Sequence, residues 1–415
     1  MKFLISGPVF SMSGYGGHAR DIALAIIEQY GKDNVRISPT GWGATPDSQH
    51  NSILEECVLR EALTEQPEIF VQVAIPNEFT QVGKVNIGIT ALCETNMCSP
   101  QWIEGLNRMD MIMVPSNFTK DVILNSIWKD DKGTVVKCTK PVEVLFEGVD
   151  LSIYFEQTDI KPFPQLDTIP ENFCFLTVGT WLAGDHLEDR KCIGGVIEYF
   201  MKAFIDIEPE VRPALVLKIT MGTYSGKYKD EMLSRIESIK NKVCLDCNVP
   251  KDKLPNVYIL HGSLTDEEMN DLYNHPKIKA MVSFTKGEGY GRPLAEWGAA
   301  TSKPLIVSNW SGHLDFCKPD SVCRLNGTLT QIHPTAVWDS ILIKESSWFT
   351  VNYEQAIKVL KNVYSKYDIF KRKSKGQHKH IVSNFTIEEM NLRLRRIIDS
   401  FLESNKKEVK FVPLK

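Results

Sequence analysis

The stretch "AMVSFTKGEGYGRPLAEWGAATSKPLIVS", Ala280–Ser308, has the pattern of one repeating unit of a parallel sheet. Short apolar runs at its two ends, Ala280–Ser283 and Leu305–Ser308, have the length and composition of buried strands. A helix is expected between them, beginning near Pro293, because proline favours the first turn of a helix. Strands that are joined through a helix pair in parallel, so this stretch predicts an α/β fold.

The same alternation of apolar runs and helical patterns extends along the chain in two series. The first series predicts strands at Lys2–Ser6, Val35–Ser38, Ile69–Ala74, Val85–Thr90, Met111–Pro115 and Val142–Phe146. The second predicts strands at Phe173–Val178, Ala214–Thr220, Val257–Leu260, Ala280–Ser283 and Leu305–Ser308. Two series of this kind predict two Rossmann-like domains with parallel sheets that face each other across a cleft.

The domain boundaries follow from these series. We expect an N-terminal domain at 1–150, a proline-containing linker at 151–172, a C-terminal domain at 173–383, and a last helix with a tail at 384–415. In the second domain, one face of a helix is apolar and would pack on the sheet, through Ile193, Val196, Ile197, Phe200 and Phe204. Capping-box patterns begin two later helices, Thr265 with Glu268 and Thr386 with Glu389.

Composition narrows the class of protein. The 415 residues are 43% hydrophobic and 24% charged, and no apolar run approaches the ~18 residues of a membrane span. Ten cysteines are scattered singly, which favours a reducing, cytoplasmic setting over a secreted disulfide framework. Cys244 and Cys247 form a lone C-x-x-C without a second pair, and no histidines show metal-ligand spacing. We therefore predict no structural metal.

Charge is unevenly distributed along the chain. The net charge is −4, yet residues 366–415 hold thirteen Lys or Arg against six Asp or Glu. The densest basic run is "KRKSKGQHKH", Lys371–His380. Such a run is either an anion-binding patch or a solvated helix face.

A glycine-rich loop follows the first predicted strand. In "SGPVFSMSGYGGHAR", Gly14, Gly16 and Gly17 precede a helix that we expect to start near His18. Glycines let backbone N–H groups approach a phosphate, and a helix N-terminus adds partial positive charge. The pattern differs from the G-x-G-x-x-G of dinucleotide enzymes, so the loop is either a phosphate cradle or only a turn.

A second loop, within the opening stretch, carries two carboxylates. Gly287, Gly289 and Gly291 expose backbone donors ahead of the helix. Glu288 on the loop can accept hydrogen bonds from sugar hydroxyls, and Glu296 in the helix can reach a ribose diol. The alternative is a surface helix with acidic residues near its N-terminus for dipole reasons.

These residues resemble a known family. The E-x₇-E of Glu288 and Glu296, followed by "KPLIVSNWSGHLDF", is similar to the retaining nucleotide-sugar glycosyltransferases of the family 4 type, whose architecture is GT-B, two facing Rossmann domains. The resemblance extends to "CETNMCSPQWIEGLNRMDMIMVPSNFTKDVI" (Cys93–Ile123), to "FEGVD" (Phe146–Asp150) and to "VGTWLAGDHLEDRKCIGG" (Val178–Gly195). It also implies a last helix that crosses back to the N-terminal domain.

The resemblance implies roles for individual residues. Arg190 and Lys191 would bind the donor diphosphate and neutralise the leaving group, and their adjacency leaves open which of them dominates. Glu288 would hold the donor sugar, Glu296 the ribose, and Glu94 would position the acceptor or the reacting sugar. The remaining donor-binding residues implied are the backbone of Gly16, Gly17, Tyr290 and Gly291, with Gly262 in the base loop His261–Ser263. The family works with a UDP, GDP or ADP sugar and usually without a metal.

The acceptor side is less defined. Tyr15, His18 and Trp42 are expected near the N-terminal part of the cleft, and His18 and His313 are either cleft-facing or structural histidines. Carbohydrate, lipid and DNA acceptors all fit. Lysine-, asparagine- and isoleucine-rich usage suits a viral or phage enzyme acting in the host cytoplasm, where a hydroxymethylated pyrimidine in DNA would be the acceptor. A nucleotide-sugar epimerase and an inactive GT-B binding module are the rival classes.

Overall fold

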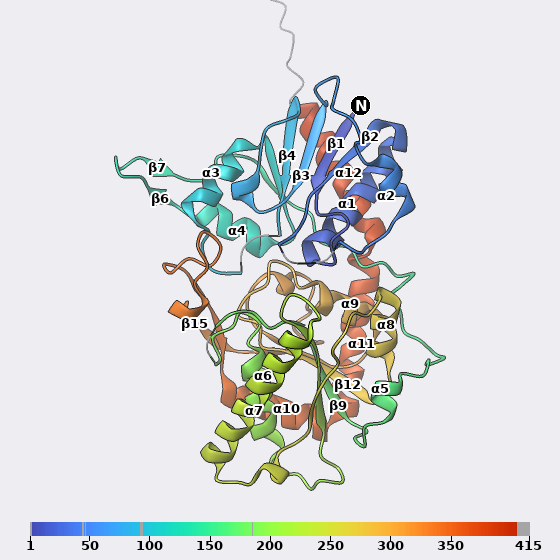
Figure 1. The fold of residues 1–415 in the computed structure, drawn as a ribbon, viewed down its shortest axis with the longest axis vertical. Helices are drawn as coiled ribbons and strands as arrows, with labels where there is room; N and C mark the ends of the chain where they lie inside the picture. The colour runs from blue at the N-terminus through green and yellow to red at the C-terminus, as the bar shows by residue number, and fades with distance from the viewer. Residues whose placement is uncertain (1, 44, 46, 92–93, 185, 405–415) are drawn as a thin grey trace, which may run out of the picture.

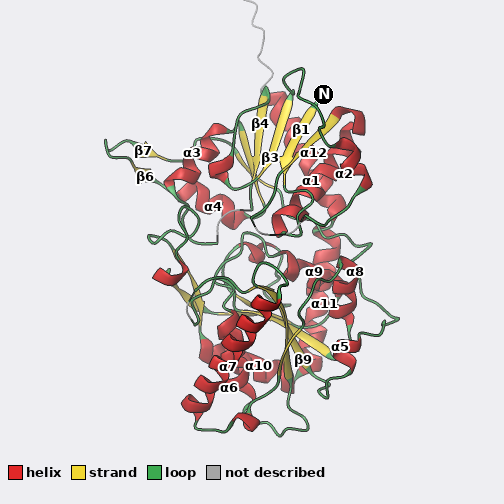
Figure 2. Cartoon of the chain, in the orientation of Figure 1, coloured by secondary structure: helices red, strands yellow, loops and turns green. Residues whose placement is uncertain are grey.

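The computed structural model describes residues 2–43, 45, 47–91, 94–184 and 186–404. Two α/β domains lie one above the other, with the N-terminal one at the top of Figure 1. Each has a central sheet flanked by helices, as Figure 2 shows by colour. Cys93, Asp185 and residues 405–415 of the expected tail lie outside the described residues.

The N-terminal sheet has six parallel strands in the order β2-β1-β3-β4-β5-β8. Helices α1, α2 and α12 (Ile387–Ser404) pack on one face, and α3 and α4 on the other, so both faces are covered and the strands are mostly apolar. The strands are β1 Phe3–Gly7, β2 Val35–Pro39, β3 Ile69–Val73, β4 Val85–Ile89, β5 Met111–Val114 and β8 Val142–Val144. The helices are α1 Gly14–Tyr30, α2 Ser52–Cys57, α3 Pro100–Arg108 and α4 Asn117–Asn125.

The C-terminal sheet repeats this plan in the order β11-β10-β9-β12-β13-β14, again all parallel. Alternate residues of a strand serve opposite faces: Phe175 packs under α6, α7 and α10, while Leu176 packs towards α8, α9 and α11. The strands are β9 Cys174–Thr180, β10 Ala214–Thr220, β11 Val257–Ile259, β12 Ile278–Ser283, β13 Leu305–Ser308 and β14 Cys323–Leu325. The helices are α6 Ile193–Phe204, α7 Gly226–Cys247, α8 Asp266–Asn274, α9 Arg292–Ala300, α10 Tyr353–Ser365 and α11 Tyr367–Asn384.

The two parallel sheets expected from the sequence are confirmed, and the five side chains of the apolar α6 stripe are all buried. The sequence did not predict β14 or two small hairpins. One hairpin, β6 Trp128–Lys129 with β7 Val135–Val136, projects from the N-terminal domain. The other, β15 Gly327–Gln331 with β16 Ser347–Val351, extends from the C-terminal domain towards the N-terminal domain. These strands are short and partly exposed, so their apolar pattern is weak.

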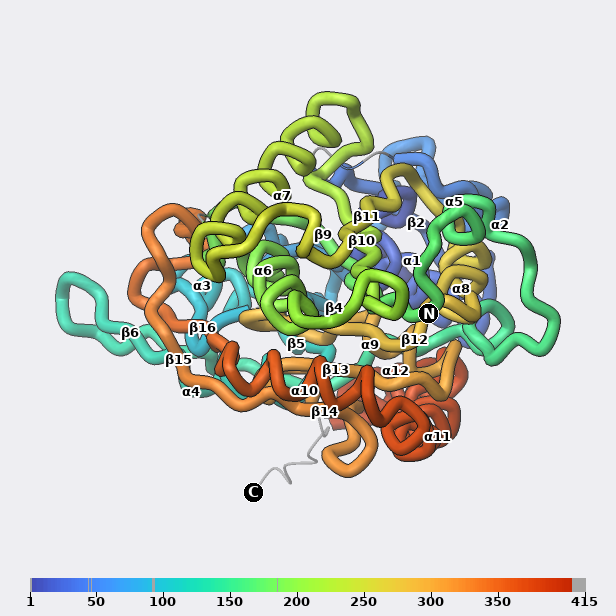
Figure 3. The backbone as a smooth tube through the Cα atoms, turned by 90° about the horizontal axis from the view of Figure 1, so that it is seen from below, coloured from blue at the N-terminus to red at the C-terminus, as the bar shows by residue number. Residues whose placement is uncertain are grey.

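Helix α12, Ile387–Ser404, returns to the N-terminal domain and packs on α1. Gln29 Nε2 donates to the Asn391 carbonyl oxygen over 2.6 Å, and Tyr30 donates to Asp399. The fully buried side chains of α12 are Met390, Leu394 and Ile398. Figure 3, the view from below, shows α10 and α11 following each other along one edge of the C-terminal domain before the chain reaches α12.

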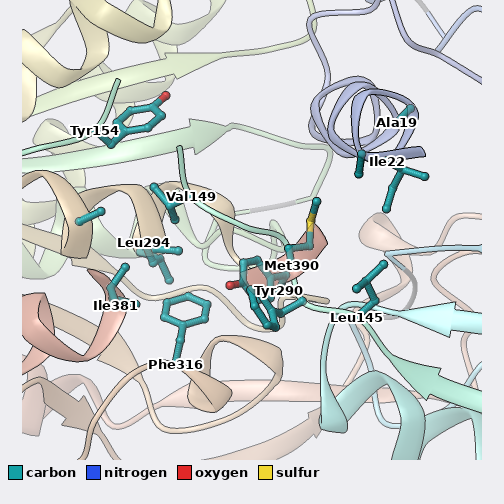
Figure 4. Close-up of a cluster of buried hydrophobic side chains, with 14 of the residues drawn as sticks. Ala19, Ile22, Leu145, Val149, Tyr154, Tyr290, Leu294, Phe316, Ile381 and Met390 are labelled. Atoms are coloured by element: carbon teal, nitrogen blue, oxygen red, sulfur yellow. The ribbon is translucent and has the colours of Figure 1, made fainter. Parts of the chain in front are cut away.

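One buried apolar cluster continues from one domain into the other (Figure 4). Leu145 and Val149 of the N-terminal domain meet Tyr290, Phe316 and Met390 there. The segment 151–172 also packs: its short helix α5, Pro164–Asp167, buries Leu166, and Tyr154 donates to Asp266 of α8. Among the described helices, none has both the length and the apolar content needed to cross a membrane.

Candidate active site

Arg190 and Lys191 lie at the end of the loop that joins β9 to α6. Local contacts fix the end of this loop. Cys192 takes a left-handed conformation with φ 51° just before α6, and the Asp189 side-chain oxygen Oδ1 accepts a hydrogen bond from the Ile193 N–H over 3.2 Å. The Lys286 N–H donates to the Arg190 carbonyl oxygen over 2.8 Å. These bonds tie the basic pair to the glycine-rich loop after β12.

Four residues predicted to be catalytic come together at this point. Lys191 Nζ contacts Glu288 Oε1 at 2.5 Å, and Arg190 Nη1 lies 3.4 Å from Glu288 Oε2. The same Arg190 nitrogen donates to the Gly287 carbonyl oxygen over 3.0 Å and lies 3.5 Å from Glu94 Oε1. Because Glu94 follows β4 and Glu288 follows β12, the cluster joins the two domains.

Charge in this cluster is strongly coupled. Burial alone would raise the pKa of Glu288, but Lys191 and Arg190 outweigh it and hold that pKa at about 2. Burial lowers the pKa of Lys191, with Glu288 opposing the effect. The pKa of Arg190 is raised by Glu94 and Glu288 despite its burial. The site therefore contains an ionised carboxylate between two cations, held in a largely dry position.

The glycine-rich loop before α9 approaches its neighbours closely. A Cβ on Gly287 would lie 2.0 Å from the Glu94 carbonyl oxygen, so only glycine fits there. Gly291 has φ 98°, a conformation that favours glycine, and helix α9 begins at the next residue. Across the cleft, Ser116 donates to the Gly289 carbonyl oxygen over 2.6 Å. The Tyr290 ring is buried against Phe316.

Glu296 belongs to a second cluster, centred on Arg292. Arg292 Nε donates to Glu296 Oε1 over 3.1 Å, while Arg292 Nη1 contacts Asp21 Oδ2 of helix α1 at 2.6 Å. Glu147, at the end of β8, lies 3.9 Å from the same Arg292 nitrogen. Burial raises the pKa of Glu296 to about 7 against the opposing effect of Arg292. In this structure, Glu296 therefore contacts a protein cation.

Helix α1 begins earlier than the sequence predicted. It starts at Gly14 rather than near His18, because Ser13 is an effective N-cap: its Oγ accepts the Gly16 N–H and its carbonyl oxygen accepts the Gly17 N–H, both over 3.0 Å. Gly16 and Gly17 are thus helical. A Cβ on Gly16 would lie 2.1 Å from the Ser11 carbonyl oxygen, and one on Gly17 would lie 3.3 Å from Arg292 Nη1.

The residues expected on the acceptor side form a third group. Tyr15 stacks on Trp42, with ring centroids 4.1 Å apart, and its hydroxyl bonds Thr90 over 2.9 Å at the carboxyl end of β4. His18 is fully buried, neither of its ring nitrogens has a described partner, and burial lowers its pKa to about 3. His18 is therefore neutral. Tyr15 and Trp42 together form a partly exposed aromatic pair.

Gly262 and His313 occupy other parts of the second domain. Gly262 has φ 128°, and its carbonyl oxygen accepts a hydrogen bond from Lys218 Nζ over 2.6 Å. Burial lowers the pKa of Lys218 to about 8, and this lysine also lies over the Tyr224 ring. His313 is buried, and its Nε2 bonds the Ser308 carbonyl oxygen over 2.8 Å, so it has a structural partner.

Sequence reasoning missed four charged residues of the cleft. They are Asp21, Glu147, Arg292 and Lys286. Arg292 lies inside the quoted stretch, and Glu147 lies inside "FEGVD", but neither motif indicates that three carboxylates would surround one guanidinium. Among the described residues, no group of three or more His, Cys, Asp or Glu side chains is arranged to hold a metal ion.

Comparison of the fold with solved structures finds the same architecture in glycosyltransferases. HepE of Anabaena, in complex with UDP and glucose, has a TM-score of 0.59 and 12% identity over 96% of this chain and 100% of its own. Sucrose-phosphate synthase of Thermosynechococcus elongatus has a TM-score of 0.62 and 12% identity, covering 98% and 100%. Trehalose-6-phosphate synthase OtsA has a TM-score of 0.61 and 11% identity over the whole of both chains.

These likenesses define the fold class. The chain has the GT-B architecture, two domains built on six-stranded parallel sheets, as the sequence predicted. The sequence itself matches no protein-family model and no curated protein. Because only 12% of the residues are identical, the structural likeness shows the architecture alone.

Proposed function

We propose that the protein transfers a sugar from a nucleotide-sugar donor to a hydroxyl acceptor. The observation that carries this proposal is the convergence of Arg190 and Lys191 on Glu288, where the loops of both domains meet. Two adjacent, buried cations suit a diphosphate, whose negative charge grows as the sugar–phosphate bond breaks. When the donor binds, its diphosphate would take over part of their pairing with Glu288.

The other residues are assigned by their positions around this pair. Glu288, on the loop before α9, would hold hydroxyls of the transferred sugar, and Glu94 would orient the acceptor or the reacting sugar. Glu296 would exchange its bond to Arg292 for the ribose diol. The backbone of Gly16, Gly17, Tyr290 and Gly291 would contact the phosphates and the sugar. The loop at Gly262 would lie beside the nucleotide base.

We further propose that transfer proceeds with retention, by departure and attack on the same face of the sugar. This route needs no covalent nucleophile from the protein, and it relies on leaving-group neutralisation by Arg190 and Lys191. For the same reason we expect activity without a divalent metal. Equal turnover with and without a chelator would support that expectation, and loss of turnover restored by a divalent ion would contradict it.

A donor screen tests the class of reaction. Purified protein would be offered UDP, GDP and ADP sugars, with nucleotide release followed with and without candidate acceptors. A transferase releases nucleotide faster with an acceptor. An epimerase converts the sugar with no acceptor present, and a binding module turns over nothing. The structures of HepE with UDP and with UDP-glucose support starting with UDP donors.

A second candidate concerns the acceptor, a hydroxymethylated pyrimidine in DNA, which a phage-type enzyme acting in a host cytoplasm would modify. The observation that favours it is helix α11, where Lys371, Arg372, Lys373, Lys375 and Lys379 are exposed and none forms an ion pair with a described residue. Lys371, Lys375 and Lys379 form a row with steps of ~6 Å, because a helix rises 1.5 Å per residue. Such a row suits phosphate contacts, and Tyr15 with Trp42 suits an extruded base.

This candidate has its own test. Hydroxymethylcytosine DNA should stimulate nucleotide release, and duplex binding should fall steeply with salt. Replacing Lys371, Arg372, Lys375 and Lys379 with Gln should weaken binding regardless of sequence, whereas replacing the exposed Lys227 and Lys229 of α7 should not. If this DNA stimulates release with none of the donors, the acceptor is a carbohydrate or a lipid.

A further inference from the structure

Glu147 is a buried residue whose carboxylate forms no hydrogen bond with the part of the chain that the structure describes. It directly follows Phe146 at the carboxyl end of β8, and about 6% of its surface is exposed. Among the described residues it forms an ion pair with Arg292, at 3.9 Å, which is beyond hydrogen-bonding distance. A buried carboxylate that is neither hydrogen-bonded nor closely paired is costly in a folded protein, so its position needs an explanation.

Pairing with Arg292 does not explain why the Glu147 carboxylate is buried. The guanidinium already has Asp21 at 2.6 Å and Glu296 at 3.1 Å, two carboxylates from two different helices. Glu147 is a third carboxylate around one cation, and it lies farther from Arg292 than either of the others. It therefore adds negative charge beyond what the pairing of Arg292 requires.

The backbone beside Glu147 is rigidly placed. The Val149 N–H donates to the Phe385 carbonyl oxygen over 2.9 Å, and the Ile387 N–H donates to the Val149 carbonyl oxygen over 3.0 Å. A Cβ on Gly148 would lie 2.6 Å from the Ile387 Cα, so the chain passes in close contact with the start of α12. Glu147 is thus presented from a fixed backbone, as a preorganised binding group would be.

Glu147 lies between the groups of the candidate active site. Its charge acts on Tyr15, on the N-terminal side, and on Tyr290, on the C-terminal side. Burial raises its pKa to about 7, against the effect of Arg292, and Glu296 and Glu288 raise it further. Geometry agrees with this placement, because its neighbour Arg292 contacts Glu296 at 3.1 Å and follows Gly291, where a Cβ would lie 3.6 Å from Glu288 Cγ.

We propose that Glu147 accepts a hydrogen bond from a hydroxyl of the transferred sugar and selects neutral sugars. The proposal rests on the proposed function. A carboxylate is a strong acceptor for a hydroxyl and repels a second carboxylate. With Glu147 and Glu288 both lining this space, a donor whose sugar carries a carboxylate is disfavoured, while a neutral hexose or pentose satisfies the unfilled oxygen.

Binding measurements separate the sugar from the nucleotide. At pH 8, where a carboxyl with a pKa of about 7 is largely ionised, wild type, Glu147→Gln and Glu147→Ala would be titrated with UDP and UDP-glucose, or with the matching GDP or ADP pair that wild type prefers. We expect Glu147→Gln to weaken nucleotide-sugar binding about 10-fold or more, as for loss of a charged hydrogen bond. Binding of the nucleoside diphosphate should change less than about twofold, since that ligand lacks the hydroxyl. Glu143→Gln, which changes an exposed carboxylate on the preceding strand β8, is the matched control.

The outcomes distinguish the inference from the function on which it rests. If wild type binds neither ligand of any pair, the proposed function fails. If wild type binds the nucleotide sugar and Glu147→Gln binds it equally well, Glu147 does not contact the sugar and the inference fails. An equal loss of affinity for the nucleotide sugar and for the nucleoside diphosphate would also overturn the inference. A weaker rejection of UDP-glucuronic acid by Glu147→Gln than by wild type would support the proposed selectivity, and unchanged rejection would contradict it.

Discussion

Arg292 and Asp21 form a 2.6 Å ion pair that joins helix α9 of the C-terminal domain to helix α1 of the N-terminal domain. Both side chains are largely buried, and Arg292 also packs against Gly17. The pair therefore fixes how the first turn of α1 lies relative to the glycine-rich loop.

Removing one partner of this pair should destabilise the protein. Asp21→Asn leaves Arg292 with Glu296 and a distant Glu147, and breaking a buried pair costs ~3 kcal/mol. Urea unfolding would measure the change. Removing the exposed partner of Lys2 with Glu65→Gln should cost less than about 1 kcal/mol, because surface pairs contribute little. Equal effects of Asp21→Asn and Glu65→Gln would contradict this reading.

The pKa values of Glu147 and Glu296 predict a pH dependence of stability. Each folded pKa is about 7, above the usual 4.5. The folded form therefore keeps protons that the unfolded chain has released, so these groups stabilise the fold at low pH, and that stability is lost as pH rises from about 4.5 to about 7. Unfolding measured between pH 5 and pH 8 should show the fall, and Glu147→Gln should flatten it. A slope that Glu147→Gln leaves unchanged would rule out this assignment.

Glu296→Gln should weaken donor binding while the fold stays intact. A charged acceptor bond to the ribose is worth roughly 1.5–3 kcal/mol, which corresponds to roughly a 10- to 100-fold loss of affinity. The measurement belongs at pH 8, where the carboxylate is largely ionised. In contrast to Glu147→Gln, Glu296→Gln should weaken the binding of the nucleoside diphosphate and of the nucleotide sugar equally. An unchanged affinity for both would remove Glu296 from the site.

Replacing Lys286 should lower both stability and turnover, because its neighbours position the loop of Arg190. It is 1% exposed, donates to Thr350 Oγ1 over 2.9 Å and lies over the Trp348 ring, while its N–H holds the Arg190 carbonyl oxygen. Lys286→Met removes the bond to Thr350 and should lower stability by ~1–3 kcal/mol. The Lys286 side chain ties the loop that contacts Arg190 to the hairpin β15–β16. Turnover should fall because Lys286→Met removes this support from the loop of Arg190. Thr350→Val, which removes the other partner, should show the same pattern, and opposite effects of the two variants would argue against it.

The fold was largely readable from the sequence, and the reason is periodicity. Buried parallel strands such as β9 and β10 are continuous apolar runs, and the α6 stripe repeats at helical spacing. The capping box of Thr265 and Glu268 is present. The start of α1 was misplaced because three glycines suggested a loop, whereas Ser13 caps a helix that contains them.

The site was predictable only where its residues belong to motifs of the family that the sequence resembles. Glu288 and the pair Arg190 and Lys191 were expected in one site, and the structure brings them together with Glu94. Asp21 and Arg292 are 271 positions apart, and no spacing rule relates them. The third carboxylate of their cluster, Glu147, has no motif of its own. Contacts between domains depend on how the two sheets are stacked, which local patterns do not encode.

Turnover of the Arg190→Ala and Lys191→Ala variants tests the central claim most directly. Nucleotide release would be measured with the donor and acceptor that wild type uses, beside Lys229→Ala as an exposed control. If these two cations neutralise the leaving diphosphate, each variant should lose ~10²–10³ in rate, as when one preorganised donor is removed. Wild-type turnover in both variants would show that the diphosphate is held elsewhere and would contradict the account.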